Sequence, residues 1–334
     1  MKKKVIFIVC LFVLMGCSTV KKNPIHESML KENSEYLNMT YTHVVPGSNQ
    51  LMTDIYYHKF NSKRFNKITE IPYKSQYPVI FYDRSNNKIY YSKKYNGSEQ
   101  LYCYDLIKKK DTRLTENLFG INAIFKVNKR KLFIISGTKG VNYCKLFEYD
   151  LIKKKCSTLY RNTFAIEAYY FSIETGLYLA GGDQKKIGLD DLRMNDIEKN
   201  NYSHHPLEIY HYDINKAKWK LIKKNNSLGY ISSFVVDEKN LYLLSNKAYR
   251  RNEAIIDTIS YFCKINLKTG KICKLKNSNN YTKLLAVHDH KMYCVEENPQ
   301  SLHLINLKNK EDSVVFHKKV EGAINNVSIG YGDL

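Results

Sequence analysis

The stretch Leu101–Asp111 reads LYCYDLIKKKD, and a second stretch, beginning at Leu146, reads LFEYDLIKKKC. Seven consecutive residues, YDLIKKK, therefore return after 45 positions. A phrase that recurs at this interval is typical of a chain built from repeated supersecondary units. The interval is too long for a heptad pattern, and no segment around it has a helical period.

Weaker copies of the phrase place Asp or Asn at the same point. The series is Asn61, Asp105, Asp150, Asp213, Asn266 and Asn306, with spacings of 44, 45, 63, 53 and 40 residues. Each member ends a run rich in Tyr, Leu and Ile and is followed by a polar turn and a second short run. Asp and Asn at the start of a turn accept hydrogen bonds from backbone N–H groups just beyond them. The series therefore predicts six β-hairpins.

A second phrase precedes each of the last five hairpins, as in KIYYS from Lys88 and KLFII from Lys131. Together the two phrases define units of four short strands, typical of the blades of a β-propeller. Five units are complete, at 79–115, 121–160, 166–223, 230–276 and 283–317. We expect an all-β, six-bladed propeller of four-stranded antiparallel blades, whose sixth blade joins 51–69 to 323–332, with 36–45 as a further candidate strand. Such closure removes exposed sheet edges. An open solenoid and two sandwiches are the alternatives.

The stretch LYCYDLIKKKDTRLT, from Leu101, resembles a blade of the TolB-type propellers, which run Leu-Tyr-x-x-Asp, a turn, then Arg-Leu-Thr. The resemblance extends as a fold over about 50–332 and is sharp only in the unit 79–115. It implies a six-bladed propeller outside the cytoplasm and transfers no catalytic residue. The chain departs from the family because most Asp-Gly turns are missing and no α/β domain precedes the repeats.

The N-terminus reads MKKKVIFIVCLFVLMGCSTVKKN. Three lysines precede an apolar run of ten residues, Val5–Leu14, which suits a secretory signal and is too short to span a bilayer. Leu-Met-Gly-Cys then resembles a bacterial lipobox, in which Cys17 accepts the lipid. We expect a signal peptide at 1–16, a lipidated Cys17 and polar tether at 17–35, and a propeller at 36–334. An ordinary signal peptide and a short anchor helix are the alternatives.

The remaining cysteines do not form a disulfide framework, since they stand singly within apolar strands and no CxxC occurs. Only Cys263 and Cys273 flank one hairpin closely enough to bridge. We predict no metal and no cofactor. His288-Asp289-His290 is expected to be a polar turn, with a metal site as the weaker interpretation.

Two long insertions, at 181–207 and 245–260, are expected to be loops between the second and third strands of neighbouring blades. Long irregular loops are often functional, and tolerated surface insertions are the alternative. The candidate partner-binding residues there are Asp190, Asp191, Arg193, His204, His205, Arg250 and Arg251.

The formal net charge is +21. Many of the lysines fall in the turns between first and second and between third and fourth strands, which lie on one face of a propeller. The residues expected to form this basic face are led by Lys108, Lys109, Lys110, Lys153, Lys154 and Lys155. Clustered charge creates a field that scattered lysines do not, and it would attract an anionic membrane or wall polymer.

The leading functional hypothesis is a lipid-anchored module on the extracytoplasmic side of the cell membrane that binds or scaffolds an envelope protein or glycan without catalysis. The alternative is an envelope glycan hydrolase or lyase with its site in the channel mouth. Carboxylates or a His converging at the mouth would favour the enzyme, since perturbed pKa values mark active sites. Nucleic acid is not an expected partner of an exported chain. A purely structural role beside another envelope protein is the third possibility.

Overall fold

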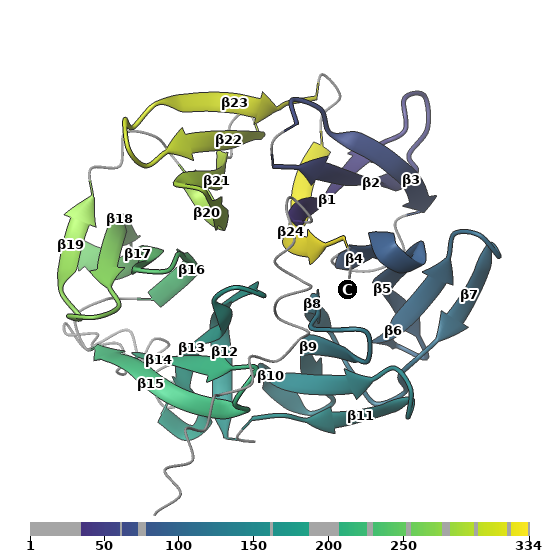
Figure 1. The fold of residues 1–334 in the computed structure, drawn as a ribbon, viewed down its shortest axis with the longest axis horizontal. Coiled ribbons are helices and arrows are strands. Elements are labelled where there is room, and N and C mark those ends of the chain that lie inside the picture. Colours follow the sequence, from purple (N-terminus) through teal and green to yellow (C-terminus); the bar gives the residue numbers. More distant parts are fainter. Residues whose placement is uncertain are drawn as a thin grey trace, which may run out of the picture.

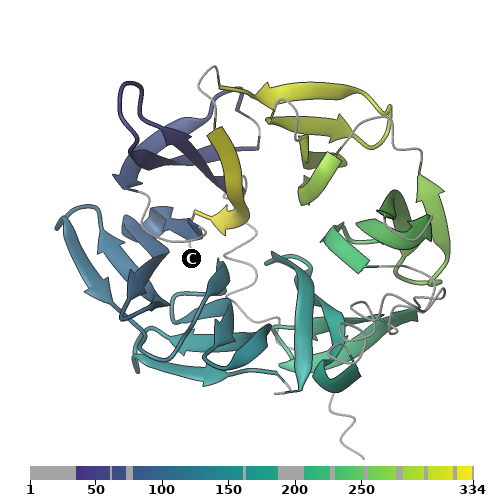
Figure 2. The same cartoon turned by 180° about the vertical axis from the view of Figure 1, so that it is seen from behind.

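A computed structural model describes residues 35–60, 62–72, 78–160, 163–186, 207–225, 230–251, 255–275, 281–296, 300–318 and 322–332. The described chain is almost entirely β-structure, and its antiparallel sheets are arranged in a ring (Figure 1). The same ring is seen from behind in Figure 2. In each set of four strands, one edge strand lies nearest the centre of the ring and the other lies at the outside of the ring.

Four of the sheets have four strands each. Sheet A has the order β24 (Gly322–Tyr331), β1 (Glu35–Val44), β2 (Leu51–Lys59) and β3 (Asn66–Pro72). Sheet B has the order β4 (Ile80–Asp83), β5 (Lys88–Tyr95), β6 (Ser98–Asp105) and β7 (Lys110–Arg113), with a 3-10 turn η1 (Arg84–Asn86) after β4. Sheet E has the order β16 (Tyr230–Val236), β17 (Asn240–Arg251), β18 (Ile255–Asn266) and β19 (Ile272–Leu275). Sheet F has the order β20 (Tyr281–His288), β21 (Lys291–Glu296), β22 (Ser301–Asn306) and β23 (Asp312–Phe316).

The remaining eight strands form one continuous sheet made of two groups of four. Group C is β8 (Ile121–Lys126), β9 (Lys131–Thr138), β10 (Val141–Asp150) and β11 (Lys155–Thr158). Group D is β12 (Phe164–Ser172), β13 (Gly176–Asp183), β14 (Leu207–Asp213) and β15 (Lys218–Asn225). The two groups are joined through β10 and β12 by the register pair Cys144↔Ile166.

Sheet A contains both ends of the described chain. β24 pairs with β1 in antiparallel register, with Leu37 opposite Ile329, and β1 pairs in turn with β2. The candidate strand at 36–45 is therefore a full member of the sheet, between the segments 51–69 and 323–332.

Strand β9 explains why these strands read as apolar runs rather than as alternating patterns. Leu132 and Ile134 pack with residues of sheet B, whereas Phe133 and Ile135 on its other face belong to the core cluster that includes group D. Both faces are covered because each sheet stacks between two neighbours, as in a propeller. The apolar burial therefore lies between sheets and not within any one of them.

The hairpin turns at the outer edge follow the repeat. Oδ1 of Asp105, Asp150 and Asp213 each accepts hydrogen bonds from the backbone N–H groups two and three residues later. Asn266 does the same, and Asn306 accepts from the N–H of Lys308. The predicted capping role of the series is confirmed at these five positions, while Asn61 lies outside the described residues.

The fourth residue after each of these five caps has a left-handed backbone. The φ angles are 50° at Lys109, 51° at Lys154, 49° at Ala217, 68° at Gly270 and 63° at Lys310. Only one of the five is glycine, the residue that adopts this conformation without steric cost. The missing Asp-Gly turns are therefore replaced by strained non-glycine residues in the same geometry.

One prediction about loops is wrong. The segment 245–260 was expected to be an irregular insertion, but its described residues extend β17 and β18 into a long hairpin, paired from Ser245↔Tyr261 to Arg251↔Ile255. Beta-branched residues in AIIDTIS favour this extension. The other insertion, at 181–207, lies largely outside the described residues.

The possible Cys263–Cys273 disulfide is also absent. Cys263 pairs with Lys274 while Cys273 pairs with Lys264, so the two side chains project from opposite faces of the sheet. Cys263 is buried and Cys273 is exposed, and both are free thiols. All six cysteines of the described part of the chain are free.

Candidate functional site

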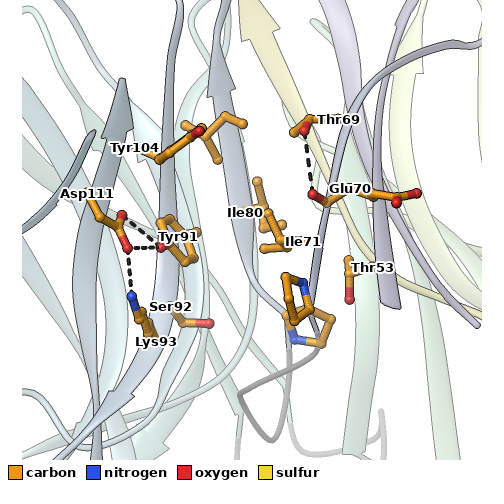
Figure 3. A pocket seen from close by; sticks show the side chains of 13 residues that line it. Thr53, Thr69, Glu70, Ile71, Ile80, Tyr91, Ser92, Lys93, Tyr104 and Asp111 are labelled. Atoms are coloured by element: carbon orange, nitrogen blue, oxygen red, sulfur yellow. Dashed lines mark hydrogen bonds and ion pairs between the residues drawn. The ribbon is translucent and has the colours of Figure 1, made fainter. Parts of the chain in front are cut away.

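A pocket of about 320 Å³ lies between sheets A and B. Its walls come from β2 and β3 on one side and from β4 to β7 on the other (Figure 3). The lining combines tyrosine, isoleucine and proline with hydroxyl, carboxylate and ammonium groups. Such a mixture of apolar surface with a few oriented polar groups is typical of ligand pockets.

The polar side of the pocket is centred on Asp111, at the start of the outer strand β7. The Tyr91 hydroxyl lies 2.8 and 2.7 Å from the two Asp111 carboxylate oxygens, and Lys93 Nζ donates to Oδ2 at 2.6 Å (Figure 3). Tyr91 and Lys93 are two residues apart on β5, so both point to the same face of the sheet. Burial, and then the bond to Asp111, raise the pKa of Tyr91. The phenol therefore stays a hydrogen-bond donor at neutral pH.

The opposite wall is formed by β3, whose Glu70 carboxylate points away from Tyr91 and Asp111 (Figure 3) and forms an ion pair with Lys67 at 2.6 Å. Lys67 also lies 2.8 Å from Asp54 Oδ1, and Lys318 bonds the other oxygen of Asp54. Burial would raise the pKa of Asp54, but hydrogen bonds from Lys318, Lys67 and Tyr56 outweigh it and lower the value to about 2. Asp111 in the pocket, and Asp54 and Glu70 on the other face of sheet A, are therefore each paired with a lysine.

A second group of ionisable side chains gathers where turns of several sheets meet. His288 Nδ1 lies 2.7 Å from Glu35 Oε2, and its ring stacks on Phe60 at 4.3 Å. The bond to Glu35 raises the pKa of His288. Burial, and then the charge of Glu35, raise the pKa of the Glu174 carboxyl, with a further contribution from Glu238. These residues come from sheets A, D, E and F, so they converge toward the centre of the ring, on the edge that bears the β20–β21 turn.

A third group resembles a nucleophile arrangement that the sequence alone did not assemble. Ser301 Oγ lies 3.0 Å from His303 Nε2, and His303 Nδ1 lies 2.9 Å from Asp312 Oδ1. The same Nε2 also lies 3.0 Å from Glu296 Oε2. A nitrogen that donates to Glu296 cannot take the Ser301 proton, and both Ser301 and His303 are buried. The geometry is that of a structural hydrogen-bond network within sheet F.

The predicted site residues fall into three sets. Cys17, Asp190, Asp191, Arg193, His204 and His205 lie outside the described residues. Arg250 and Arg251 end strand β17 instead of belonging to an irregular loop. The six lysines Lys108–Lys110 and Lys153–Lys155 are all exposed in turns or at strand starts.

Of the predicted partner-binding residues, only Arg250 and Arg251 are described, and neither lines the pocket. Tyr91 and Lys93 are two residues apart in an apolar strand, and only the cross-strand register brings Asp111 to them. Glu174 and Glu35 carry no local pattern either. Among these residues, only His288 belongs to a feature that the sequence predicts, a polar turn, and Asp289 and His290 do form that turn.

Within the described ranges, no three His, Cys, Asp or Glu side chains are grouped closely enough to hold a metal ion. The same part of the chain contains no helix long and apolar enough to cross a membrane.

Comparison with known proteins supports the fold. No protein-family model matches the chain, and no curated protein matches it. Among solved structures, a chain from the crystal structure of a nidogen/laminin complex superposes with a TM-score of 0.57 at 10% identity, over 90% of this chain and 100% of that one. TolB from Acinetobacter baumannii superposes with a TM-score of 0.50 at 11% identity, over 89% of this chain and 67% of that one. The chain therefore has a β-propeller-like fold, in agreement with the resemblance to TolB-type blades.

Proposed function

We propose that the protein is a non-catalytic binding module, built as a closed six-bladed β-propeller and held at the extracytoplasmic face of the cell membrane through Cys17. The six-blade count is supported by sheets A, B, E and F together with groups C and D, which are joined only through the pair Cys144↔Ile166. Closure is supported by the pairing of β24 with β1.

The observation that carries the binding role is the fixed position of the acid in the pocket. Asp111 is held by Tyr91 and Lys93. A carboxylate fixed in this way orients donors and acceptors toward a ligand. Hydroxyl, ammonium and carboxylate groups beside the tyrosines Tyr91 and Tyr104 suit a polyhydroxylated ligand, such as an envelope glycan.

The test is a titration of the full chain with purified envelope polysaccharide, in which binding is measured by calorimetry. Tyr91→Phe and Asp111→Asn are expected to weaken binding by about tenfold each, since a hydrogen bond to a charged group contributes roughly 1.5–3 kcal/mol. Glu116→Gln is the matched control, because Glu116 pairs with Arg113 on the exposed part of the same region and does not line the pocket. Equal affinity of all three variants for the polysaccharide would show that the pocket is not the binding site.

The second candidate is a glycan hydrolase, and one observation favours it. Glu174 has a raised pKa and lies close enough to Glu35 and His288 for their charges to act on its carboxyl group. A general acid requires a raised pKa, and the shift of Glu174 is in that direction. This group lies on the edge of the first-to-second-strand turns, whereas the insertions predicted to bind a partner belong to second-to-third-strand connections. Release of reducing ends by the native chain, lost in Glu174→Gln, would establish the enzyme in place of the binding module.

A further inference from the structure

Two turns of neighbouring units carry the repeated phrase, and each presents an exposed isoleucine followed by three lysines. Ile107 is 74% exposed and Ile152 is 64% exposed, the two highest values among the large exposed apolar side chains of the described chain. The corresponding positions of the other described turns are Asn215, Lys268 and Lys308. A single exposed apolar side chain is common on protein surfaces, but here the same one recurs on two neighbouring turns, each time beside three lysines.

Hydrogen bonds place the two turns on one continuous edge. Leu106 N donates to Asn87 O in sheet B, and Leu151 N donates to Arg130 O in group C. Each turn is thereby tied to the first-to-second-strand turn of its own unit. Those inner turns are joined by the ion pair of Lys126 with Asp83, at 2.6 Å and fully buried. Ile107 and Ile152 thus point out from the same edge of two adjacent units.

The charge on this edge is strongly positive and little neutralised. Asp105 and Asp150 use an oxygen to cap their own turns, and Glu148 is paired with Lys131 at 3.0 Å. None of the six lysines Lys108–Lys110 and Lys153–Lys155 forms an ion pair with a described residue.

The chain enters the ring at the same edge. The Tyr36 hydroxyl donates to Tyr82 O at 2.7 Å and accepts from Arg84 N at 3.1 Å, directly beside η1 of sheet B. Residues 18–34 lie between this point and Cys17, and a chain of that length spans at most about 60 Å. A lipid on Cys17 would therefore hold this edge within reach of the bilayer.

From these observations we infer that the edge formed by Ile107, Ile152 and the six lysines docks on an anionic lipid surface, with the two isoleucines inserted among the acyl chains. The inference rests on the proposed membrane location and deepens it by giving the orientation. Lysines draw the edge to the headgroups, and their attraction falls off within a Debye length of about 8 Å at physiological salt. The isoleucines supply the apolar insertion that charge alone lacks.

The test places a single tryptophan at each edge of the full chain. In a Trp219→Phe background, Ile107→Trp reports on the docking edge, and Phe119→Trp is the control. Phe119 is 47% exposed and lies at the other end of the strands, where its backbone forms hydrogen bonds with the backbone of Glu99 and Gly137. The two edges are about 25 Å apart, given about 3.3 Å per residue along β5. The vesicles are phosphatidylcholine with or without phosphatidylglycerol, and brominated acyl chains quench any inserted tryptophan.

We expect quenching of the tryptophan in Ile107→Trp in anionic vesicles only, with none in Phe119→Trp. Replacing the six lysines by glutamate should abolish it. Ile107→Ala and Ile152→Ala should each lower the vesicle partition coefficient by about tenfold, since partial burial of the carbon atoms removed is worth roughly that factor.

Equal quenching of the tryptophans at positions 107 and 119 would overturn the inference. Vesicle binding that depends on the lysines but shows no quenching would also overturn it, because a surface that binds anionic polymers behaves in this way. Mass spectrometry of Cys17 in the same preparation separates the two proposals. A lipidated chain without quenching refutes the docking edge alone, and quenching without lipidation refutes the anchor alone.

Discussion

The buried ion pair of Lys126 with Asp83 joins group C to sheet B, and its removal gives a quantitative test of how the units are held together. Lys126 Nζ lies 2.6 Å from Asp83 Oδ2 and 3.2 Å from Ser85 Oγ, and the two charged side chains are 1% and 0% exposed. Ser85 and Asn86 donate to the same carboxylate at 2.7 and 2.8 Å. The Asp83 carboxylate therefore accepts hydrogen bonds from three donors, one of which is the Lys126 ammonium group.

Lys126→Met keeps the length of the side chain and removes its charge, leaving a buried carboxylate with two neutral donors. Breaking one partner of a buried pair costs about 3–5 kcal/mol. Replacing both, as Lys126→Met with Asp83→Asn, removes the stranded charge and should recover most of that loss, because neutral replacements of whole buried pairs are often tolerated. The coupling between the two sites should therefore exceed about 1 kcal/mol in a double-mutant cycle.

Urea unfolding followed by circular dichroism and by Trp219 fluorescence measures these free energies. The denaturant slope must stay constant for the comparison to hold. A loss below about 1 kcal/mol in Lys126→Met would refute the reasoning, because losses of that size are usual for exposed pairs. A double variant no more stable than Lys126→Met would refute it equally.

Three further predictions concern pH, turns and packing. Asp54 has a pKa of about 2 in the folded chain against an ordinary 3.8, so its contribution to the free energy of unfolding is complete above pH 3.8 and is lost as the pH falls toward 2. After allowance for the exposed lysine partners, this contribution is about 1–2 kcal/mol. Asp54→Asn should flatten that part of the stability curve in acid titrations. Lys109→Gly and Lys154→Gly should each stabilise the chain by about 0.5–1 kcal/mol in urea unfolding, since glycine relieves the left-handed backbone, whereas Lys153→Gly should not. Gly181→Ala should destabilise by at least about 2 kcal/mol in the same assay, because its Cβ would lie 1.9 Å from Ala165 O; a neutral effect would mean that β12 and β13 separate easily.

The repeat made most of the fold predictable. The capping series located the outer hairpins because an Asx turn is a local interaction, written in four or five adjacent residues. The strand units followed because stacked sheets bury both faces, which leaves continuous apolar runs such as KLFII. The hairpin at 245–260 was missed because NKAYRRNE carries polar residues and no strand period, while its pairing depends on register with the following segment.

The candidate sites were much less predictable. Tyr91, Lys93 and Asp111 meet through cross-strand register, and Glu35, Glu174 and His288 come from three different sheets, so neither group has a local signature. The pocket walls come from strands β2 to β7, and their side chains meet only when sheets A and B stack on each other. Only the basic turns, where sequence and position coincide, could be located in advance.

Pairing of β24 with β1 is the feature on which the proposed closed six-bladed propeller depends, and truncation tests it most directly. The chain lacking residues 322–334 is compared with a control lacking only 332–334, which keeps the whole of β24. Circular dichroism during thermal unfolding is expected to show one cooperative transition in the control and a broad, non-cooperative loss of structure in the truncated chain, because β1 and the inner ends of the sheets become exposed edges. Identical cooperative melting of the two chains would contradict the closed ring.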